Sequence, residues 1–352
     1  MPVSTRRPVV AILPSRDEPD TIAAVTRAVD LALDDENALI VHADASRSPA
    51  TTTAFRGVST RARTACLAGL PLGKGTQIRH ALTQLDEHGT VLLADTDTRN
   101  PDPTTYRALL DAVASGAAIA LADYPRYWDE ANLTHWIARP LIAAATGHDV
   151  PQPLAGDIAL AATVASAVPA RYTALPAALA ACVDGYGIDA FVLHTAACLG
   201  KPVSVRLAST KQHAPSFPHL PAIFAQAVPV LLHPATTTTA TAPPVGEFRI
   251  TERRMPDQQR KQILARLQAL QPTENPYDHH PWPRSLASAW QAVASGIPAT
   301  TVTRWLWPAY LNRVHTWLAN GENSDLATRA ATLRAAARDV LTLLTTTGKD
   351  TS

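Results

Sequence analysis

Short apolar runs alternate with segments of helical periodicity along the first third of the chain. The strand-like runs span residues 8–13, 38–41, 64–67, 90–94 and 117–122. Strands joined by connections of helix length are typical of a mostly parallel sheet with right-handed crossovers. We therefore predict an α/β fold, Rossmann-like, with a mostly parallel sheet and flanking helices. Ligands of such folds bind at the carboxyl ends of the strands, which is where candidate site residues are sought.

The rest of the chain indicates an appended helical region. A further strand is predicted over residues 202–207, and a Thr/Ala/Pro-rich stretch without periodicity follows at 237–244. Helical periodicity then returns at about 256–270, 285–295, 299–319 and 323–346. We predict an α/β domain over residues 1–236, a linker over 237–250 and a helical domain over 251–352.

Composition excludes several classes of protein. The 352 residues are 46% apolar, which is ample for a core, and the net charge of +1 offers no basic excess for nucleic acid. Three cysteines without CxxC spacing fit a reducing cytosol rather than a disulfide framework or a zinc site. No run approaches the roughly 20 apolar residues that span a bilayer. We expect a cytoplasmic protein without a membrane or nucleic-acid partner.

The strongest candidate for chemistry is a DxD pattern, Asp95-Thr96-Asp97, directly after the apolar run at 90–94. Carboxylates at the end of a buried strand can hold a divalent cation that neutralises a leaving diphosphate. One DxD is expected by chance in a chain of this size, and a solvated turn in which an Asp caps a helix is the alternative. The position after a strand favours the functional interpretation.

Other polar stretches also follow predicted strands. Residues 14–18 and 42–46 could contact a nucleotide, or could mark ordinary strand-to-helix turns. Residues 73–76 could present backbone N–H groups and an ammonium to phosphates, or form a plain glycine turn. They are not a Walker A loop, and a GxGxxG fingerprint is absent after the first strand, which argues against NAD or FAD.

Histidines and tryptophans offer weaker signals. His213 lies in a polar loop after the strand at 202–207, where it could complete a carboxylate–imidazole metal site or lie on the surface. Asp278, His279 and His280 are interpreted as a surface or interface turn. Five of the seven tryptophans fall after residue 280, at helical spacing that favours core or subunit contacts. They make a homodimer plausible.

Taken in order, these motifs resemble the retaining GT-A nucleotide-sugar glycosyltransferases, in particular the glucosyl-3-phosphoglycerate synthase and mannosylglycerate synthase family. The matching stretches lie between residues 8 and 255. They are VVAILPSRDEPDTIAAV, IVHADAS, LGKG, VLLADTDT, ARPLIAA, PLAGDIAL, DGYGIDAFVL, the loop with His213, and ERRM. The resemblance implies a GT-A fold over the α/β region.

The resemblance also implies roles by position. It implies that Asp97 and His213 coordinate Mn²⁺ or Mg²⁺, and that Asp97, Asp189 and Thr134 lie at the reacting centre. The implied nucleotide-sugar contacts are Pro14, Ser15, Arg16, Glu18, Asp44, Lys74, Asp95, Thr96 and Asp157. The implied acceptor contacts are Asn132, Leu133, Thr134, Tyr186 and Lys211.

Two departures from the family bear on the acceptor. Family members that use phosphoglycerate have arginines where this chain has Asn132 and Lys211, and an asparagine where it has Pro215. Arginine binds phosphate through two parallel hydrogen bonds and lysine does not. Each lost charge-assisted hydrogen bond is worth about 1.5–3 kcal/mol. We therefore expect an acceptor other than 3-phosphoglycerate, a small polar molecule with a hydroxyl or thiol nucleophile.

The motifs indicate a metal-dependent hexosyltransferase that uses a UDP- or GDP-linked sugar, and the resemblance implies that it retains the anomeric configuration. Two alternatives stay open. A sugar-1-phosphate nucleotidyltransferase shares the α/β nucleotide site but usually has a glycine-rich signature, which PSRDEPD lacks. A non-catalytic nucleotide-sugar-binding protein would bind the donor without transferring its sugar.

Overall fold

The computed structural model describes residues 7–85, 88–252, 255–270 and 280–346. The chain divides into two compact units. The first unit comprises residues 1–123 and 155–215, and the second comprises 124–154 and 216–352. This division differs from the predicted boundary at residue 236, because residues 124–154 and 216–236 group with the C-terminal helices.

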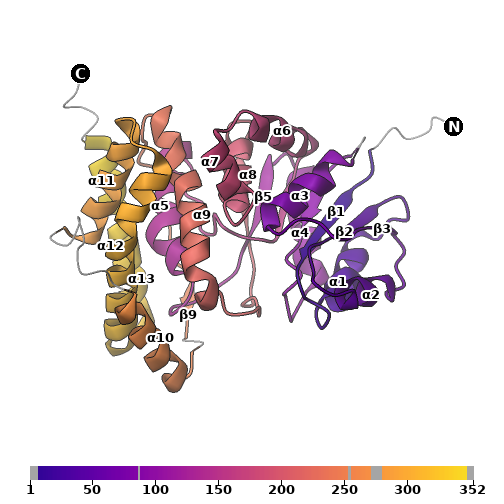
Figure 1. The fold of residues 1–352 in the computed structure, drawn as a ribbon, viewed down its shortest axis with the longest axis horizontal. Coiled ribbons are helices and arrows are strands. Elements are labelled where there is room, and N and C mark those ends of the chain that lie inside the picture. The colour runs from indigo at the N-terminus through magenta and orange to yellow at the C-terminus, as the bar shows by residue number, and fades with distance from the viewer. Residues whose placement is uncertain (1–6, 86–87, 253–254, 271–279, 347–352) are drawn as a thin grey trace. The chain divides into compact units, whose positions relative to one another are not determined.

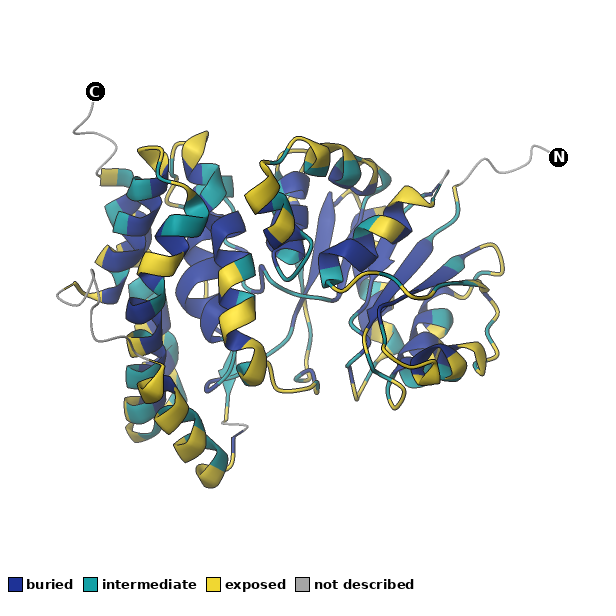
Figure 2. Ribbon diagram, viewed as in Figure 1, coloured by how far each residue is buried: buried dark blue, intermediate teal, exposed yellow. Residues whose placement is uncertain are grey.

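The first unit is built on a seven-stranded sheet with the order β3-β2-β1-β4-β7-β5-β8. Its strands are β1 (Val10–Ser15), β2 (Leu39–Asp44), β3 (Arg63–Leu67), β4 (Val91–Leu93), β5 (Ile119–Asp123), β7 (Ile158–Leu160) and β8 (Pro202–Arg206). Six of the strands match the predicted apolar runs. The central strands are buried throughout, shown by their dark blue colour in Figure 2, which explains their nearly continuous apolar sequence.

Strand β7 is the element of this sheet that the sequence analysis missed. It pairs antiparallel with both β4 and β5, while the other pairs are parallel. Its three residues Ile158–Leu160 follow directly on Asp157, so the loop before β7 opens at the carboxyl end of β4. The sheet is therefore mostly parallel, as predicted, with one reversed strand that brings residues 155–157 to the predicted ligand edge.

Helices flank this sheet (Figure 1). They are α1 (Ile22–Leu33), α2 (Ala50–Arg56), α3 (Lys74–Thr83), α4 (Pro103–Ala114), α6 (Ala162–Thr173), α7 (Ala177–Val183) and α8 (Ile188–Ala197). Helix α4 begins as predicted: Asp102 accepts a hydrogen bond from Thr104 N at 2.9 Å, and Pro103 occupies the first turn. Helix α1 packs against α4, and α3 packs against α6 and α8.

The second unit is mainly helical. A five-residue π-helix, Thr134–Ala138, continues into α5 (Arg139–Thr146), and α9 is Leu220–Leu232. The C-terminal helices are α10 (Asp257–Ala269), α11 (Trp282–Ala294), α12 (Ala299–Asn320) and α13 (Leu326–Thr346), which match the predicted helical segments. Trp282, Trp290 and Trp317 are buried, whereas Trp305 is 41% exposed. Most of these tryptophans therefore serve the core of this unit.

Residues 237–250, predicted as a linker, are tied down within the second unit. They have no regular structure before β9 (Ile250–Thr251), which pairs with β6 (Arg126–Tyr127). Arg139 anchors the stretch: its guanidinium donates to both oxygens of Asp149 at 2.7 Å and to Glu247 O at 3.0 Å. Gly246 N in turn donates to Asp149 Oδ2. We call residues 237–250 the strap.

In the part of the chain that the structure describes, no single helix is both long and apolar enough to cross a membrane. Helices α7 and α8 pass that test only as a pair, and they are bent against each other by 103°.

Candidate functional site

The DxD segment leaves β4 and is fixed by neighbouring strands. Asp95 N donates to Asp157 Oδ1 at 3.0 Å, which ties the segment to the start of β7. The Thr96 hydroxyl donates to Pro14 O at 2.8 Å, which ties it to the end of β1. Within the turn, the Thr98 hydroxyl donates a hydrogen bond to Asp95 O. Asp95 and Thr96 of the DxD pattern are thus held by hydrogen bonds to neighbouring strands.

Two lysines bridge three aspartates inside this site. Lys74 Nζ lies 3.0 Å from Asp95 Oδ1 and 3.0 Å from Asp189 Oδ1. Lys211 Nζ lies 2.9 Å from Asp95 Oδ2 and 2.8 Å from Asp157 Oδ2. The structure therefore joins five predicted site residues in one chain of ion pairs with Asp95 at its centre. The predicted acceptor contact of Lys211 would require its ammonium to leave two carboxylates.

Burial and charge set the pKa values of this cluster. Burial opposes the ionised form of Asp95, but the Lys211 and Lys74 ammoniums outweigh it and hold the pKa of Asp95 far below its usual range. Burial also opposes the charged lysines, yet their carboxylate partners raise the pKa of both. Asp189 differs, because burial raises its pKa to about 6 and Lys74, which it shares with Asp95, offsets only part of that effect.

Asp97 and His213 come together beside this cluster. Asp97 Oδ2 lies 3.9 Å from His213 Nδ1, although 116 positions separate the two residues in the chain. Their loops are hydrogen-bonded to each other: Arg99 N donates to Gln212 O, and Gln212 N donates to Asn100 Oδ1, both at 2.8 Å. The side-chain amide of Asn100 donates to Thr210 O at 3.1 Å. Hydrogen bonds between the two loops, two of them through the Asn100 side chain, thus hold Asp97 beside His213.

This pair has the chemistry of a two-ligand cation site. His213 Nδ1, the atom that lies 3.9 Å from Asp97, also lies 2.7 Å from Ala214 O. In the tautomer in which Nδ1 donates to that carbonyl, Nε2 is the nitrogen left to bind a metal. Burial raises the pKa of Asp97, and the nearby Asp95 carboxylate adds to the rise, so a cation would relieve repulsion here. Among the described residues no group of three or more His, Cys, Asp or Glu side chains could hold a metal. The remaining ligands would have to come from substrate and water.

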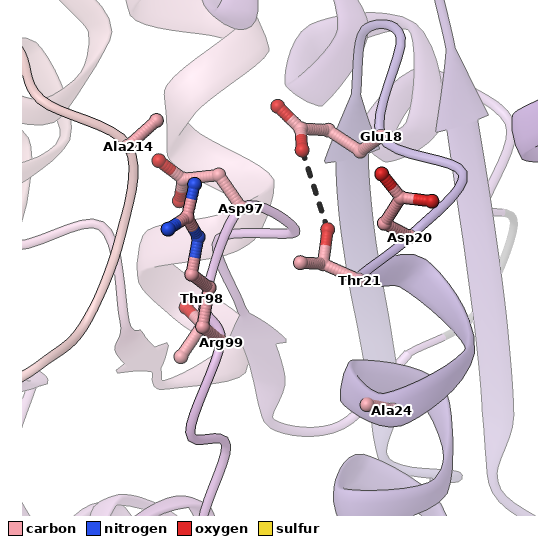
Figure 3. A pocket seen from close by; sticks show the side chains of 8 residues that line it. All are labelled: Glu18, Asp20, Thr21, Ala24, Asp97, Thr98, Arg99 and Ala214. Atoms are coloured by element: carbon pink, nitrogen blue, oxygen red, sulfur yellow. Dashed lines mark hydrogen bonds between the residues drawn. The ribbon is translucent and has the colours of Figure 1, made fainter.

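A cleft of about 400 Å³ opens beside Asp97 (Figure 3). The loop after β1 contributes Glu18 and Asp20 to it, the loop after β4 contributes Asp97 and Arg99, and Ala214 lines a third side. Burial raises the pKa of Glu18, and the Asp97 carboxylate raises it further. Glu18 accepts a hydrogen bond from Thr21, drawn as a dashed line in Figure 3. The predicted residues Glu18 and Asp97 therefore share one acidic cleft.

Other predicted nucleotide residues are engaged with the protein itself. The Ser15 hydroxyl lies 2.5 Å from His42 Nε2 and 3.2 Å from Asp44 Oδ1. The other oxygen of Asp44 accepts from Thr52 at 2.7 Å. Ser15 and Asp44 are buried, and they join the ends of β1 and β2. Arg16, the next residue, is exposed.

The glycine turn at residues 73–76 does not form the phosphate cradle considered from the sequence. Gly75 N donates to Gly185 O at 3.2 Å, and Thr76 N donates to Asp184 O at 3.0 Å. A Cβ on Gly75 would lie 1.8 Å from Val183 O, so the glycine allows α3 to approach the end of α7. The N–H groups at this helix start are used in packing, and only the Lys74 side chain reaches the site.

Two residues that sequence reasoning missed support the site. A Cβ on Gly156 would lie 1.8 Å from Asp95 Oδ2, so the Asp95 carboxylate packs directly on this glycine. The buried Gln77 amide donates to Ser15 O at 2.6 Å and to Ala43 O at 2.8 Å, which clamps β1 to β2. The glycine in PLAGDIAL was a visible signal, but nothing in the sequence indicated what it packs against.

The remaining predicted residues are distributed over both units. Tyr186 is half-buried; burial raises its pKa, and the charges of Lys74 and Arg16 oppose the rise, which indicates that its hydroxyl lies near them. Asn132, Leu133 and Thr134 are buried in the second unit, at the start of the helix that leads into α5. They follow Ala131, whose φ of 54° is unusual for a residue with a side chain. Of the predicted surface turn, Asp278 and His279 lie outside the described residues, and His280 is exposed.

Comparisons by sequence find no relative: no protein-family model and no curated protein matches the chain. Solved structures do match. Glucosyl-3-phosphoglycerate synthase from Mycobacterium tuberculosis, in complex with Mn²⁺, UDP and phosphoglyceric acid, is 23% identical with a TM-score of 0.51. The match covers 65% of this chain and 78% of that one.

Two further structures of the same enzyme give similar values. The complex with Mn²⁺, UDP and glucosyl-3-phosphoglycerate has a TM-score of 0.50 at 23% identity, over 65% of this chain and 80% of that one. A third structure of the enzyme has a TM-score of 0.50 at 22% identity, with the same coverage. The predicted fold class is confirmed: the chain shares the GT-A fold of these structures, a mostly parallel sheet with flanking helices, and has a helical region at its C-terminus.

Proposed function

We propose that this protein is a metal-dependent glycosyltransferase that moves a sugar from a nucleoside-diphosphate sugar to a small polar acceptor. The observation that carries the proposal is the Asp97–His213 pair, 3.9 Å apart at the end of the central strand β4 of a GT-A sheet. Carboxylate and imidazole together suit Mn²⁺ at least as well as Mg²⁺. Similar solved structures are complexes with Mn²⁺ and UDP or UDP-glucose, which makes a UDP-sugar the first donor to test.

The site residues suit a diphosphate donor. A bound cation would act as a Lewis acid on the diphosphate and stabilise its negative charge. Glu18 and Asp97 line the cleft in which that cation would lie. Lys74, whose side chain is 19% exposed, contacts Asp95 of the same DxD segment. We assign Lys74 to the donor phosphates, for which it would exchange one of its two carboxylate partners.

A route without a covalent intermediate fits the carboxylates at hand. Asp157 is fully buried, and its two oxygens are engaged by Asp95 N and by Lys211. Both oxygens of Asp189 lie within 3.2 Å of Lys74. The oxygens of both carboxylates are thus occupied by protein partners in this structure, which disfavours either one as a covalent nucleophile. We infer retention by a front-face route, in which the acceptor attacks beside the departing phosphate and a phosphate oxygen takes the acceptor proton.

The acceptor is proposed to be small and polar, with a hydroxyl or thiol nucleophile, and to differ from 3-phosphoglycerate. Asn132 stands where an arginine is expected for a phosphorylated acceptor, and the Lys211 ammonium is already paired with two carboxylates. Without two guanidinium groups the chain lacks the usual bidentate grip on phosphate. The homodimer also stays a prediction, which sedimentation equilibrium would check.

The donor class is tested by thermal shift with nucleoside diphosphates and their sugars in the presence of Mn²⁺. A ligand at 100 times its Kd stabilises the folded state by about 2.7 kcal/mol, which raises the melting temperature measurably. We expect the nucleotides of one base to raise the melting temperature, and to do so only when the metal is present. We expect Asp97→Ala and His213→Ala to abolish this rise. Arg61→Ala, at an exposed ion pair with Asp34, is the matched control.

Three outcomes would contradict the proposal. Release of pyrophosphate from a nucleoside triphosphate and a sugar phosphate would assign a nucleotidyltransferase. Donor binding with neither sugar transfer nor slow donor hydrolysis would assign a sensor. Full transfer activity in both the Asp97→Ala and His213→Ala variants would remove the metal site.

A further inference from the structure

Lys211 is buried between two carboxylates, and the proposed reaction assigns it no task. Its side chain is 6% exposed, and its ammonium lies 2.9 Å from Asp95 Oδ2 and 2.8 Å from Asp157 Oδ2. Lys74, the other lysine of the cluster, is more exposed at 19%. Lys211 is thus the more deeply buried of the two lysines, and it joins the loop after β8 to the end of β4 and the start of β7.

In both segments that Lys211 joins, the ion-pairing residue and the predicted metal ligand are separated by the same number of positions. Asp95 precedes Asp97 by two residues, and Lys211 precedes His213 by two residues. Asp95 and Lys211 form an ion pair, and Asp97 and His213 lie 3.9 Å apart. Beyond them, the hydrogen bond from Arg99 N to Gln212 O holds the same two segments together. Figure 3 shows the segment that carries Ala214 beside the loop that carries Asp97.

We propose that Lys211 is a positioning residue that sets the separation between the metal-binding side chains of Asp97 and His213. The inference rests on the proposed function, since it concerns the same cation site. Residues that orient metal ligands without touching the metal commonly change metal affinity when they are replaced. Lys211 acts on the metal ligands through Asp95. The ion pair between Lys211 and Asp95 fixes how the segment that carries His213 aligns with the segment that carries Asp97.

A purely electrostatic role for Lys211 makes a different prediction. The cluster holds Asp95, Asp157 and Asp189 against two lysines, so Lys211→Met leaves buried carboxylates without a counter-charge. If charge balance were its whole role, Asp157→Asn in the same chain would restore both stability and metal binding. If Lys211 positions the metal ligands, the double variant regains stability but still binds the metal weakly, because the Lys211–Asp95 ion pair is lost.

The test measures Mn²⁺ affinity directly, from the electron paramagnetic resonance signal of free Mn²⁺, with UDP or GDP present, whichever stabilises the wild-type protein. Lys211→Met, Lys211→Arg and Lys211→Met/Asp157→Asn are compared with Lys201→Met, the same substitution at an exposed lysine outside the cluster. We expect Mn²⁺ affinity about 10–100-fold weaker in Lys211→Met and in the double variant. We expect Lys211→Arg, which keeps the positive charge, to lose less Mn²⁺ affinity than Lys211→Met does.

Melting temperatures and kinetics complete the test. The melting temperature should fall in Lys211→Met and recover in the double variant, so the double variant decides the question if the single one fails to fold. Weakened metal binding should raise the Mn²⁺ concentration needed for half-maximal transfer more than it lowers kcat. Wild-type Mn²⁺ affinity in the folded double variant overturns the inference and leaves the proposed function intact. A wild-type protein that binds no Mn²⁺ with either nucleotide overturns both.

Discussion

At the scale of single residues, the site depends on Asp95. Its carboxylate contacts two buried ammoniums, its N–H donates to Asp157, and its side chain packs on Gly156. Removing several ions from water costs several kcal/mol each, and close pairing offsets that cost only when the geometry is held. The cluster therefore fixes positions more than it adds stability, and small changes next to Asp95 should have large effects.

Gly156→Ala tests this packing. The added Cβ would lie 1.8 Å from Asp95 Oδ2, so the carboxylate must move away from its lysines. We expect transfer activity to fall by at least tenfold, by analogy with other changes beside metal ligands. We also expect the free energy of unfolding to fall by about 1–3 kcal/mol, as for overpacked sites.

Gly57→Ala is the matched control, since its Cβ would meet nothing closer than 3.5 Å. Steady-state kinetics and urea unfolding measure the two variants. Near-wild-type activity of Gly156→Ala would show that Asp95 does not depend on this contact.

The raised pKa of Asp189 predicts a specific pH dependence. Burial raises this pKa from 3.8 to about 6, so the folded protein holds the proton more tightly than the unfolded chain does. The stability contributed by this group is present below about pH 4 and is lost as the pH rises through 6. At about 1.4 kcal/mol per pKa unit, the loss approaches 3 kcal/mol.

Asp189→Asn removes the titration and keeps the size of the side chain. Urea unfolding of both proteins between pH 4 and pH 7 isolates the effect. The wild-type free energy of unfolding minus that of the variant should decrease over this range. A constant or rising difference would mean that the pKa of Asp189 is not raised.

At the scale of elements, the strands and helices that could be predicted are those with a clear apolar run or a recognisable cap in their own sequence. Strand β1 and helix α4 have the apolar runs and the Asp102 cap that the sequence displays, and both form where expected. Strand β7 was missed because three apolar residues carry no periodicity. Helix α2 was missed because ATTTAFR has no amphipathic pattern.

The site itself was predictable only in part, because its contacts join distant positions. The Lys74–Asp189 and Lys211–Asp95 pairs span 115 and 116 positions, and no local rule couples such residues. The resemblance to a family indicated which residues gather, but not which of them pair with each other. For that reason the internal pairing of Lys211 and the packing of Gly156 are visible only in three dimensions.

Gly75→Ala tests the start of helix α3. Within a helix, glycine to alanine usually stabilises a protein by about 0.5–1 kcal/mol. Here the new Cβ would lie 1.8 Å from Val183 O, a backbone atom that cannot turn aside. We expect a loss of at least 1 kcal/mol in urea unfolding, in line with other overpacked sites. A stabilised variant would contradict the close contact of α3 with the end of α7.

At the scale of the whole molecule, the chain forms two compact units, each made of two separate stretches of sequence. The first unit holds the ion-pair cluster and the Asp97–His213 pair. The second unit holds the helices and the strap, which Arg139 anchors through Asp149 and Glu247. The predicted acceptor residues Asn132, Leu133 and Thr134 belong to this second unit.

Arg139→Met tests whether the strap is stabilised within the second unit. Arg139 is buried and stacks on the Phe248 ring at 4.0 Å. Its loss leaves Asp149 unpaired, which typically costs about 3–5 kcal/mol. Hydrogen exchange should become faster in α5 and in residues 237–250, while β1 and β4 keep their protection. Equally faster exchange in β1 and β4 would contradict the conclusion that Arg139 stabilises the second unit alone.

The central claim is that one cation is held jointly by Asp97 and His213. Electron spin echo envelope modulation of the Mn²⁺–UDP complex, or of the GDP complex if that nucleotide binds, detects a nitrogen ligand directly. The account predicts ¹⁴N modulation from an imidazole in the wild-type protein, and its loss in His213→Gln while the protein stays folded. Bound Mn²⁺ without nitrogen modulation, or modulation that persists in His213→Gln, would contradict the account.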